Sequence, residues 1–100
     1  MFNIGKSRYE TKGINERLCL DYRITIWKLI EKLSKEVELD YLQVFELFIE
    51  DGKVQKIRHS QEVPEYEKTY IVPMVDDGIE GKVFVIDDGE YSTMLWADEY

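Results

Sequence analysis

The pattern of apolar positions predicts one amphipathic helix over residues 21–37. The apolar side chains recur at spacings of 4, 3, 1, 3 and 4 and form a single stripe, which consists of Tyr22, Ile26, Leu29, Ile30, Leu33 and Val37. Asp21 is placed to cap the first turn, and Glu31 and Lys35 form an i,i+4 pair of opposite charge, as do Lys32 and Glu36. We expect this stripe to pack on a sheet.

The remainder of the chain has the alternation and turn residues of about five to six short strands. Asp51-Gly52 and Asp88-Gly89 are the sequence signals of two hairpins, and Pro73 confines its strand to a sheet edge or ends it. The predicted strand segments are residues 8–14, 41–59 (a hairpin), 67–74, 82–86 and 91–96. Because hairpins dominate and there is one helix, we predict an α+β fold in a single domain, residues 1–100, with a mainly antiparallel sheet and the helix on one face.

The turn at Asp51-Gly52 also predicts a register. With a two-residue loop, Glu50 faces Lys53, and Phe45, Leu47 and Ile49 share one face with Val54. In that register the opposite face is mixed, with Ile57 and His59 beside Val44, Glu46, Phe48 and Glu50. We expect the helix to pack on the face that carries Phe45, Leu47 and Ile49.

The formal net charge of −8 lies almost entirely in the second half of the chain. Residues 1–50 carry eight Lys or Arg against nine Asp or Glu (net −1), and residues 51–100 carry five against twelve (net −7). A negative field disfavours direct binding to nucleic acid. The single cysteine excludes an intramolecular disulfide, and no apolar run approaches the ~20 residues that cross a bilayer, so we expect a cytoplasmic protein without a membrane segment.

The acidic residues of the second half are the predicted partner surface. In a two-residue hairpin loop Asp87 and Glu90 would face each other, and a four-residue loop closed by Ile86 and Tyr91 would relieve that repulsion. The predicted surface consists of Asp76, Asp77, Asp87, Asp88, Glu90, Asp98 and Glu99. It could attract a basic partner, such as the DNA-binding surface of an enzyme, or serve only to keep the protein in solution.

Catalytic and metal chemistry find little support in the residue pattern. Cys19 and His59 are the one possible thiol–imidazole pair, and no sequence signature surrounds either. The acidic turns offer oxygen ligands, but "DDGEYSTMLWAD" lacks the ligand spacing of a calcium loop, and no glycine-rich phosphate loop occurs. We therefore predict no catalytic residue, no metal site and no cofactor.

Ile24 and Trp27 lie off the main stripe of the predicted helix. If nothing covers them, they form a surface for self-association as a homodimer. The alternative is that residues 1–4 or a loop fold over Trp27.

Three stretches, "RYETKGINE" (8–16), "ELDYLQVFEL" (38–47) and "KVFVIDDGEYSTMLWADEY" (82–100), resemble the small bacterial family called domain of unknown function 960, of staphylococcal type. The resemblance implies an uncharacterised cytoplasmic protein, in some cases encoded near mobile genetic elements, and transfers no catalytic residues. The leading functional hypothesis is a non-enzymatic protein–protein interaction module with an unknown protein partner. The alternatives are an acidic inhibitor or DNA mimic that binds a nucleic-acid-processing enzyme, and a metal-dependent factor that uses the acidic turns.

Overall fold

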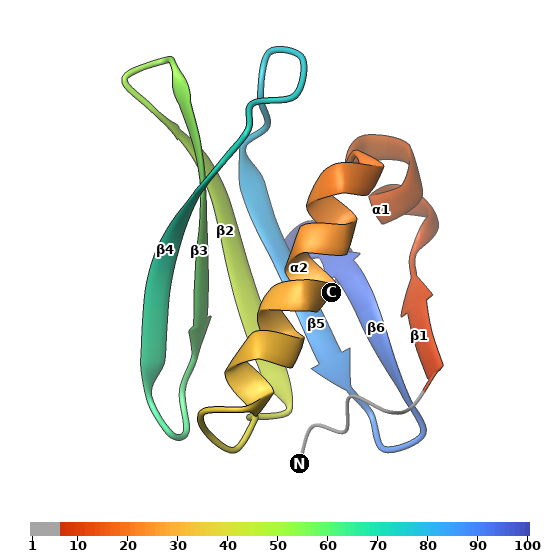
Figure 1. The fold of residues 1–100 in the computed structure, drawn as a ribbon. Helices are drawn as coiled ribbons and strands as arrows, with labels where there is room; N and C mark the ends of the chain where they lie inside the picture. The colour runs from red at the N-terminus through yellow and green to blue at the C-terminus, as the bar shows by residue number, and fades with distance from the viewer. Residues whose placement is uncertain (1–6) are drawn as a thin grey trace.

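A computed structural model describes residues 7–100 as a six-stranded sheet with its helices on one face (Figure 1). The strand order is β1-β6-β5-β2-β3-β4; β1 pairs with β6 in parallel, and every other neighbouring pair is antiparallel. The elements in chain order are β1 (Ser7–Glu10), α1 (Lys12–Arg17), α2 (Leu20–Ser34), β2 (Leu42–Glu50), β3 (Val54–Gln61), β4 (Tyr66–Val72), β5 (Gly81–Asp87), β6 (Tyr91–Trp96) and a short 3₁₀ helix, η1 (Ala97–Glu99). The predicted α+β class is confirmed, with a sheet that is mixed rather than purely antiparallel.

Helix α2 packs the predicted stripe against the sheet. Five members of the stripe are buried in α2, and Val37 lies beyond the helix end and is half-buried. The helix begins one residue earlier than predicted, so Cys19 is the N-cap residue and Asp21 lies inside the first turn. The prediction that Asp21 caps the helix was wrong, although its charge still favours the positive end of the helix dipole.

The first predicted strand, residues 8–14, is wrong in its second half. β1 ends at Glu10, and α1 begins because Thr11 is an N-cap residue whose Oγ1 accepts a hydrogen bond from the Ile14 N–H (3.2 Å). The turn of α1 brings Ile14 into the core, where it is fully buried. The described chain therefore has a second helix that the apolar pattern, with a single buried residue over six positions, did not indicate.

The β2–β3 hairpin turns at Asp51-Gly52 as predicted, but its register differs by one residue. Asp51 and Gly52 have positive φ (53° and 67°), and Lys53 is an additional residue after the turn, so Glu50 pairs with Val54. The shift places Ile57 opposite Leu47 and His59 opposite Phe45. Both Ile57 and His59 are therefore fully buried on the helix side, which corrects the predicted mixed face.

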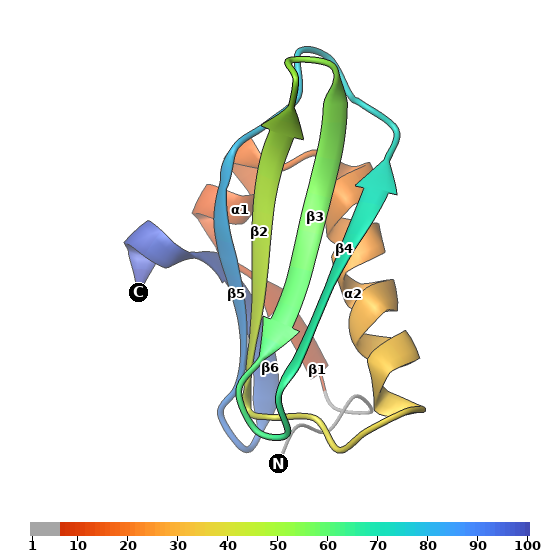
Figure 2. The same ribbon diagram turned by 90° about the vertical axis from the view of Figure 1, so that its left-hand side faces the viewer.

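Helices α1 and α2 cover one face of the sheet. Neither of them lies over the other face, which we call the open face. Figure 2 shows β2, β3 and β4 toward the viewer with α1 and α2 behind them. The helix side holds the sheet part of the core, which consists of Phe45, Leu47, Ile57, Val83, Val85, Met94 and Trp96. Among the described residues, no helix is long and apolar enough to cross a membrane.

Candidate functional site

The acidic residues that the sequence groups together lie at two ends of the sheet. Asp76 and Asp77 are exposed in the β4–β5 loop, whereas Asp88 and Glu90 are exposed in the β5–β6 turn. These two segments lie at opposite ends of β5 (Figure 1), and a seven-residue strand is ~20 Å long. The structure therefore does not bring the predicted residues into one acidic surface.

Asp87 is a structural residue of the β5–β6 turn. Asp87 is buried and is the register partner of Ser92, so residues 88–90 connect β5 to Tyr91, the first residue of β6. The Asp87 carboxylate accepts a hydrogen bond from the Gly89 N–H (2.9 Å), and the Asp88 carboxylate accepts one from the Tyr91 N–H (3.1 Å). The predicted closing pair of Ile86 and Tyr91 was wrong, and Asp87 does not face Glu90. The charge of Asp88 raises the pKa of Tyr91.

The two acidic residues near the C-terminus bind other parts of the chain. Glu99 Oε1 accepts hydrogen bonds from Thr11 Oγ1 (2.8 Å) and from the Trp96 N–H (2.8 Å), and Asp98 forms an ion pair with Arg17 (3.5 Å). These contacts hold η1 against α1. Glu99 therefore has a structural role.

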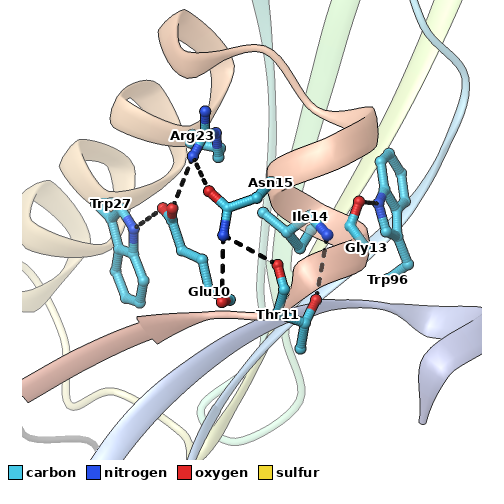
Figure 3. A network of polar contacts seen from close by, with 8 residues as sticks. All are labelled: Glu10, Thr11, Gly13, Ile14, Asn15, Arg23, Trp27 and Trp96. Carbon is cyan, nitrogen blue, oxygen red and sulfur yellow. Dashed lines mark hydrogen bonds and ion pairs between the residues drawn. The ribbon is translucent and has the colours of Figure 1, made fainter.

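Trp27 is covered by β1. Its indole is 9% exposed, its Nε1 donates to Glu10 Oε2 (3.0 Å), and the Arg8 guanidinium lies 4.9 Å from its ring centroid. Figure 3 shows Glu10 between Trp27 and Arg23, whose Nη1 donates to Glu10 Oε1 (2.9 Å). Ile24, in contrast, is 43% exposed, so the structure separates the two residues of the predicted self-association surface.

Cys19 and His59 lie in different surroundings, and the described chain has no hydrogen bond between their side chains. Cys19 precedes α2 and is half-buried, whereas His59 is fully buried in β3 and stacks on Phe45 with 4.3 Å between ring centroids. The one hydrogen bond of His59 within the described chain joins its Nε2 to Gln43 Oε1 (2.7 Å). The described residues also include no group of three or more His, Cys, Asp or Glu side chains that could hold a metal ion.

A chain of buried amides determines which nitrogen of His59 carries the proton. The Asp40 N–H can only donate, so the Gln61 atom that it contacts (3.0 Å) is an oxygen. Gln43 Nε2 donates to that same oxygen and to the Asp40 carbonyl (2.8 Å each), which leaves Gln43 Oε1 as the acceptor for His59. His59 is therefore the neutral Nε2–H tautomer, and burial lowers its pKa from 6.5 to about 4.

The open face of the sheet carries apolar side chains that neither α1 nor α2 covers, and η1 with Tyr100 lies against part of it at β5. By the alternation of strands, the residues between the buried ones of β2 and β5 point to this face. Ile71 on β4 is 73% exposed, and the Tyr100 ring meets Phe84 edge-on at 5.7 Å between centroids. The apolar residues of this face are exposed at Ile71, buried at Leu95 and half-buried at the other positions, which are Leu42, Val44, Phe48, Val54, Phe84 and Ile86.

Charges in the middle of the open face are paired. Arg58 Nη1 lies 2.7 Å from Glu46 Oε1, and Lys56 Nζ lies 2.6 Å from Glu50 Oε2. The Arg58 guanidinium also lies over the Phe48 ring, at 4.9 Å from its centroid. This region therefore presents apolar surface with little net charge.

At one end of the open face lies a pocket of about 430 Å³, which we call the corner pocket. It forms where β2 begins, β3 ends and β4 begins, and its apolar part comes from Tyr41, Leu42 and Val44. Its acidic part consists of Asp40, Glu62, Glu65 and Glu67, and no Lys or Arg among the described residues lines it.

The apolar pattern does not indicate the corner pocket. Residues 60–66 lie between the predicted strand segments, whereas β3 extends to Gln61 and β4 begins at Tyr66. The pairing of Ser60 with Glu67 and of Gln61 with Tyr66 folds the acidic residues of this segment around the start of β2.

One of the comparisons with known proteins identifies the family of this chain. A family model described as staphylococcal protein of unknown function (DUF960) matches residues 7–99. A crystal structure of a protein of unknown function from Enterococcus faecalis is similar, with 27% sequence identity, a TM-score of 0.83, and coverage of 100% of this chain and 98% of that chain. The search of curated proteins gave no match. The resemblance seen in the sequence is thus confirmed, and the chain belongs to the family of staphylococcal proteins of unknown function, DUF960.

Proposed function

We propose that the protein is a non-enzymatic protein-binding module and that the open face of its sheet is the contact surface. The observation that carries this proposal is the set of apolar side chains that β2, β4 and β5 place on the sheet face that neither α1 nor α2 covers. Antiparallel sheets commonly leave one face to solvent, but that face is then polar at alternate positions. Here β2 and β5 add apolar side chains beside the paired charges of that face, which favours contact with another protein.

The dimensions of the molecule suit an interface of ordinary size. The described chain measures 37 × 28 × 20 Å, so its broad side has an area of roughly 1,000 Å², and a standard interface buries ~800 Å² on each partner. The charges of Glu46 and Glu50 are paired with Arg58 and Lys56 within the chain, so a partner that covers them leaves no buried charge without a counter-charge.

The proposal that the protein is non-enzymatic rests on the surroundings of His59 and Cys19, the two residues best suited to catalysis. The single imidazole is fully buried and hydrogen-bonded to an amide, and its ring has no hydrogen bond to the single thiol. The alternative of an acidic inhibitor or DNA mimic has lost the geometry on which it depended, because Asp76 and Asp88 lie at opposite ends of β5.

The test compares two exposed positions on opposite sides of the molecule. Immobilised wild type, Ile71→Glu and Ile24→Glu are used to capture proteins from a staphylococcal lysate, and the captured protein is then purified and titrated against each variant. Ile71 lies on the open face and Ile24 on α2, and both are exposed, so neither change should disturb the fold. We expect Ile71→Glu to raise the Kd about tenfold or more and Ile24→Glu to leave it unchanged.

A partner whose affinity falls only in Ile24→Glu would contradict the proposal, because the contact would then lie on α2. Equal affinity for all three proteins would contradict it as well. Thermal melts of each variant confirm that the change in affinity is not a change in folding.

A further inference from the structure

We infer that the partner on the open face inserts a Lys or Arg side chain into the corner pocket. This inference rests on the proposed function and adds the chemistry of the partner: a protein surface in which a basic side chain adjoins apolar ones.

Charge complementarity is the first step of the argument. In the middle of the open face the acidic side chains have basic partners within the chain, as Glu46 has Arg58. At the corner pocket, Glu62, Glu65 and Glu67 are exposed and form no ion pair or hydrogen bond within the described chain. The negative charge beside the corner pocket is therefore uncompensated within the described chain, and a cation from outside the chain would neutralise it.

The shape and lining of the corner pocket fit a long basic side chain. Leu42 and Val44 offer apolar surface to an aliphatic stem, and the carboxylates of the rim would receive its charged end. Tyr41, which is 54% exposed, also lines the pocket, and aromatic faces attract Lys and Arg.

The arrangement favours a side chain over a free metal ion. A divalent cation needs several oxygen ligands that converge on one point. The described residues contain no such group, so the carboxylates of the corner pocket are spread around its rim. A basic side chain makes fewer and more widely spaced contacts, and its stem would also bury apolar surface, which a metal ion cannot do.

The experiment uses peptides from a phage-displayed library of random dodecamers, selected on the wild-type protein. Two variants lose the same formal charge at different places. The rim variant neutralises the corner pocket by Glu62→Gln, Glu65→Gln and Glu67→Gln. The loop control neutralises the far end of the sheet by Asp76→Asn, Asp77→Asn and Glu80→Gln.

We expect the selected peptides to combine Lys or Arg with apolar residues and to lose affinity for Ile71→Glu. Three exposed carboxylates together account for about a tenfold change in Kd, so the rim variant should bind about tenfold more weakly at low salt while the loop control binds like wild type. The difference should shrink as ionic strength rises, because exposed charges are screened.

The outcomes separate this inference from the proposed function. Peptides that lose affinity for Ile71→Glu but bind the rim variant like wild type would overturn the inference and leave the open face as a binding surface. Peptides that are insensitive to Ile71→Glu would overturn both. Sedimentation equilibrium tests whether a second copy of the chain covers the open face instead. If the wild type is a dimer that Ile71→Glu dissociates, the open face is a dimer interface and the inference is overturned.

Discussion

The buried imidazole of His59 should make the protein less stable in mild acid, and the effect can be worked out from its surroundings. In the folded protein the neutral Nε2–H tautomer donates to Gln43 Oε1, while Nδ1 is buried and has no hydrogen-bond partner within the described chain. A proton on Nδ1 would therefore place a cation between the Phe45 ring and the edge of Tyr66 without an acceptor. Burial accordingly lowers the pKa of His59 to about 4.

The sign and size of the effect follow from linkage. Between the ordinary pKa of 6.5 and the folded value of about 4, the unfolded chain binds the proton and the folded chain does not. The free energy of unfolding therefore falls as the pH is lowered from about 6.5, and the loss is complete below about 4. A difference of that size corresponds to about 3 kcal/mol, at 1.36 kcal/mol for each pH unit.

NMR can follow the titration of His59 without overlap from other imidazoles, because His59 is the only histidine of the chain. Its ring proton resonance, followed by NMR from pH 7.5 to the acid transition, gives the pKa directly. Urea denaturation of wild type and His59→Gln over the same pH range then isolates the contribution of His59, because the Gln side chain can donate to Gln43 but does not titrate. The many carboxylates titrate in both proteins and cancel in the difference.

We expect the stability of wild type, relative to His59→Gln, to fall by about 3 kcal/mol between pH 6.5 and pH 4. A measured pKa near 6.5, or parallel stability curves for the two proteins, would show that the imidazole is hydrated in solution and would refute the buried tautomer.

Two further predictions test the packing of the helices. Leu33→Ala should lower the free energy of unfolding by ~2 to 5 kcal/mol, because Leu33 is 1% exposed. The control, Ile24→Ala at an exposed position of the same helix, should change it by less than ~0.5 kcal/mol. Equal midpoints of urea denaturation for the two variants would show that the stripe is not part of the core. Glu10→Gln should cost about 2 kcal/mol, because Arg23 is 15% exposed and would lose its charged partner, whereas Glu31→Gln should cost under ~1 kcal/mol because its pair with Arg8 is exposed. Equal costs for these two changes would contradict the role of Glu10 as the link between β1 and α2.

The parts of the fold that the sequence predicted are those with local signals. The stripe of α2 repeats over four turns, and Asp-Gly dipeptides mark the β2–β3 and β5–β6 hairpins, so this helix and these two turns could be placed from neighbouring residues alone. The pairing of β1 with β6 could not be predicted, because it joins segments more than 80 residues apart and depends on where the intervening elements pack. Trp27 is covered for the same reason: Glu10 and Arg8 belong to the strand that this pairing positions.

A single residue decided the face assignment of the first hairpin. Lys53 follows the Asp51-Gly52 turn as an extra residue, and each strand position after it moves to the other face. Ile57 and His59 are buried for this reason. Dipeptide signals identify a turn but do not count the residues that close it, so the two-residue loop was a reasonable prediction with a wrong outcome.

The candidate surface could not be read from charge alone, because the carboxylates of this chain do two different things. Asp87, Asp88 and Glu99 accept hydrogen bonds from backbone N–H groups, so their carboxylates stabilise the β5–β6 turn and the C-terminal 3₁₀ helix. Glu62 and Glu65 contribute the same charge to the sequence but bind nothing within the described chain. Only the hydrogen-bond partners distinguish the two groups. The uncompensated carboxylates lie beside apolar surface of the open face, and it is this combination, rather than a net charge of −8, that points to a basic protein partner.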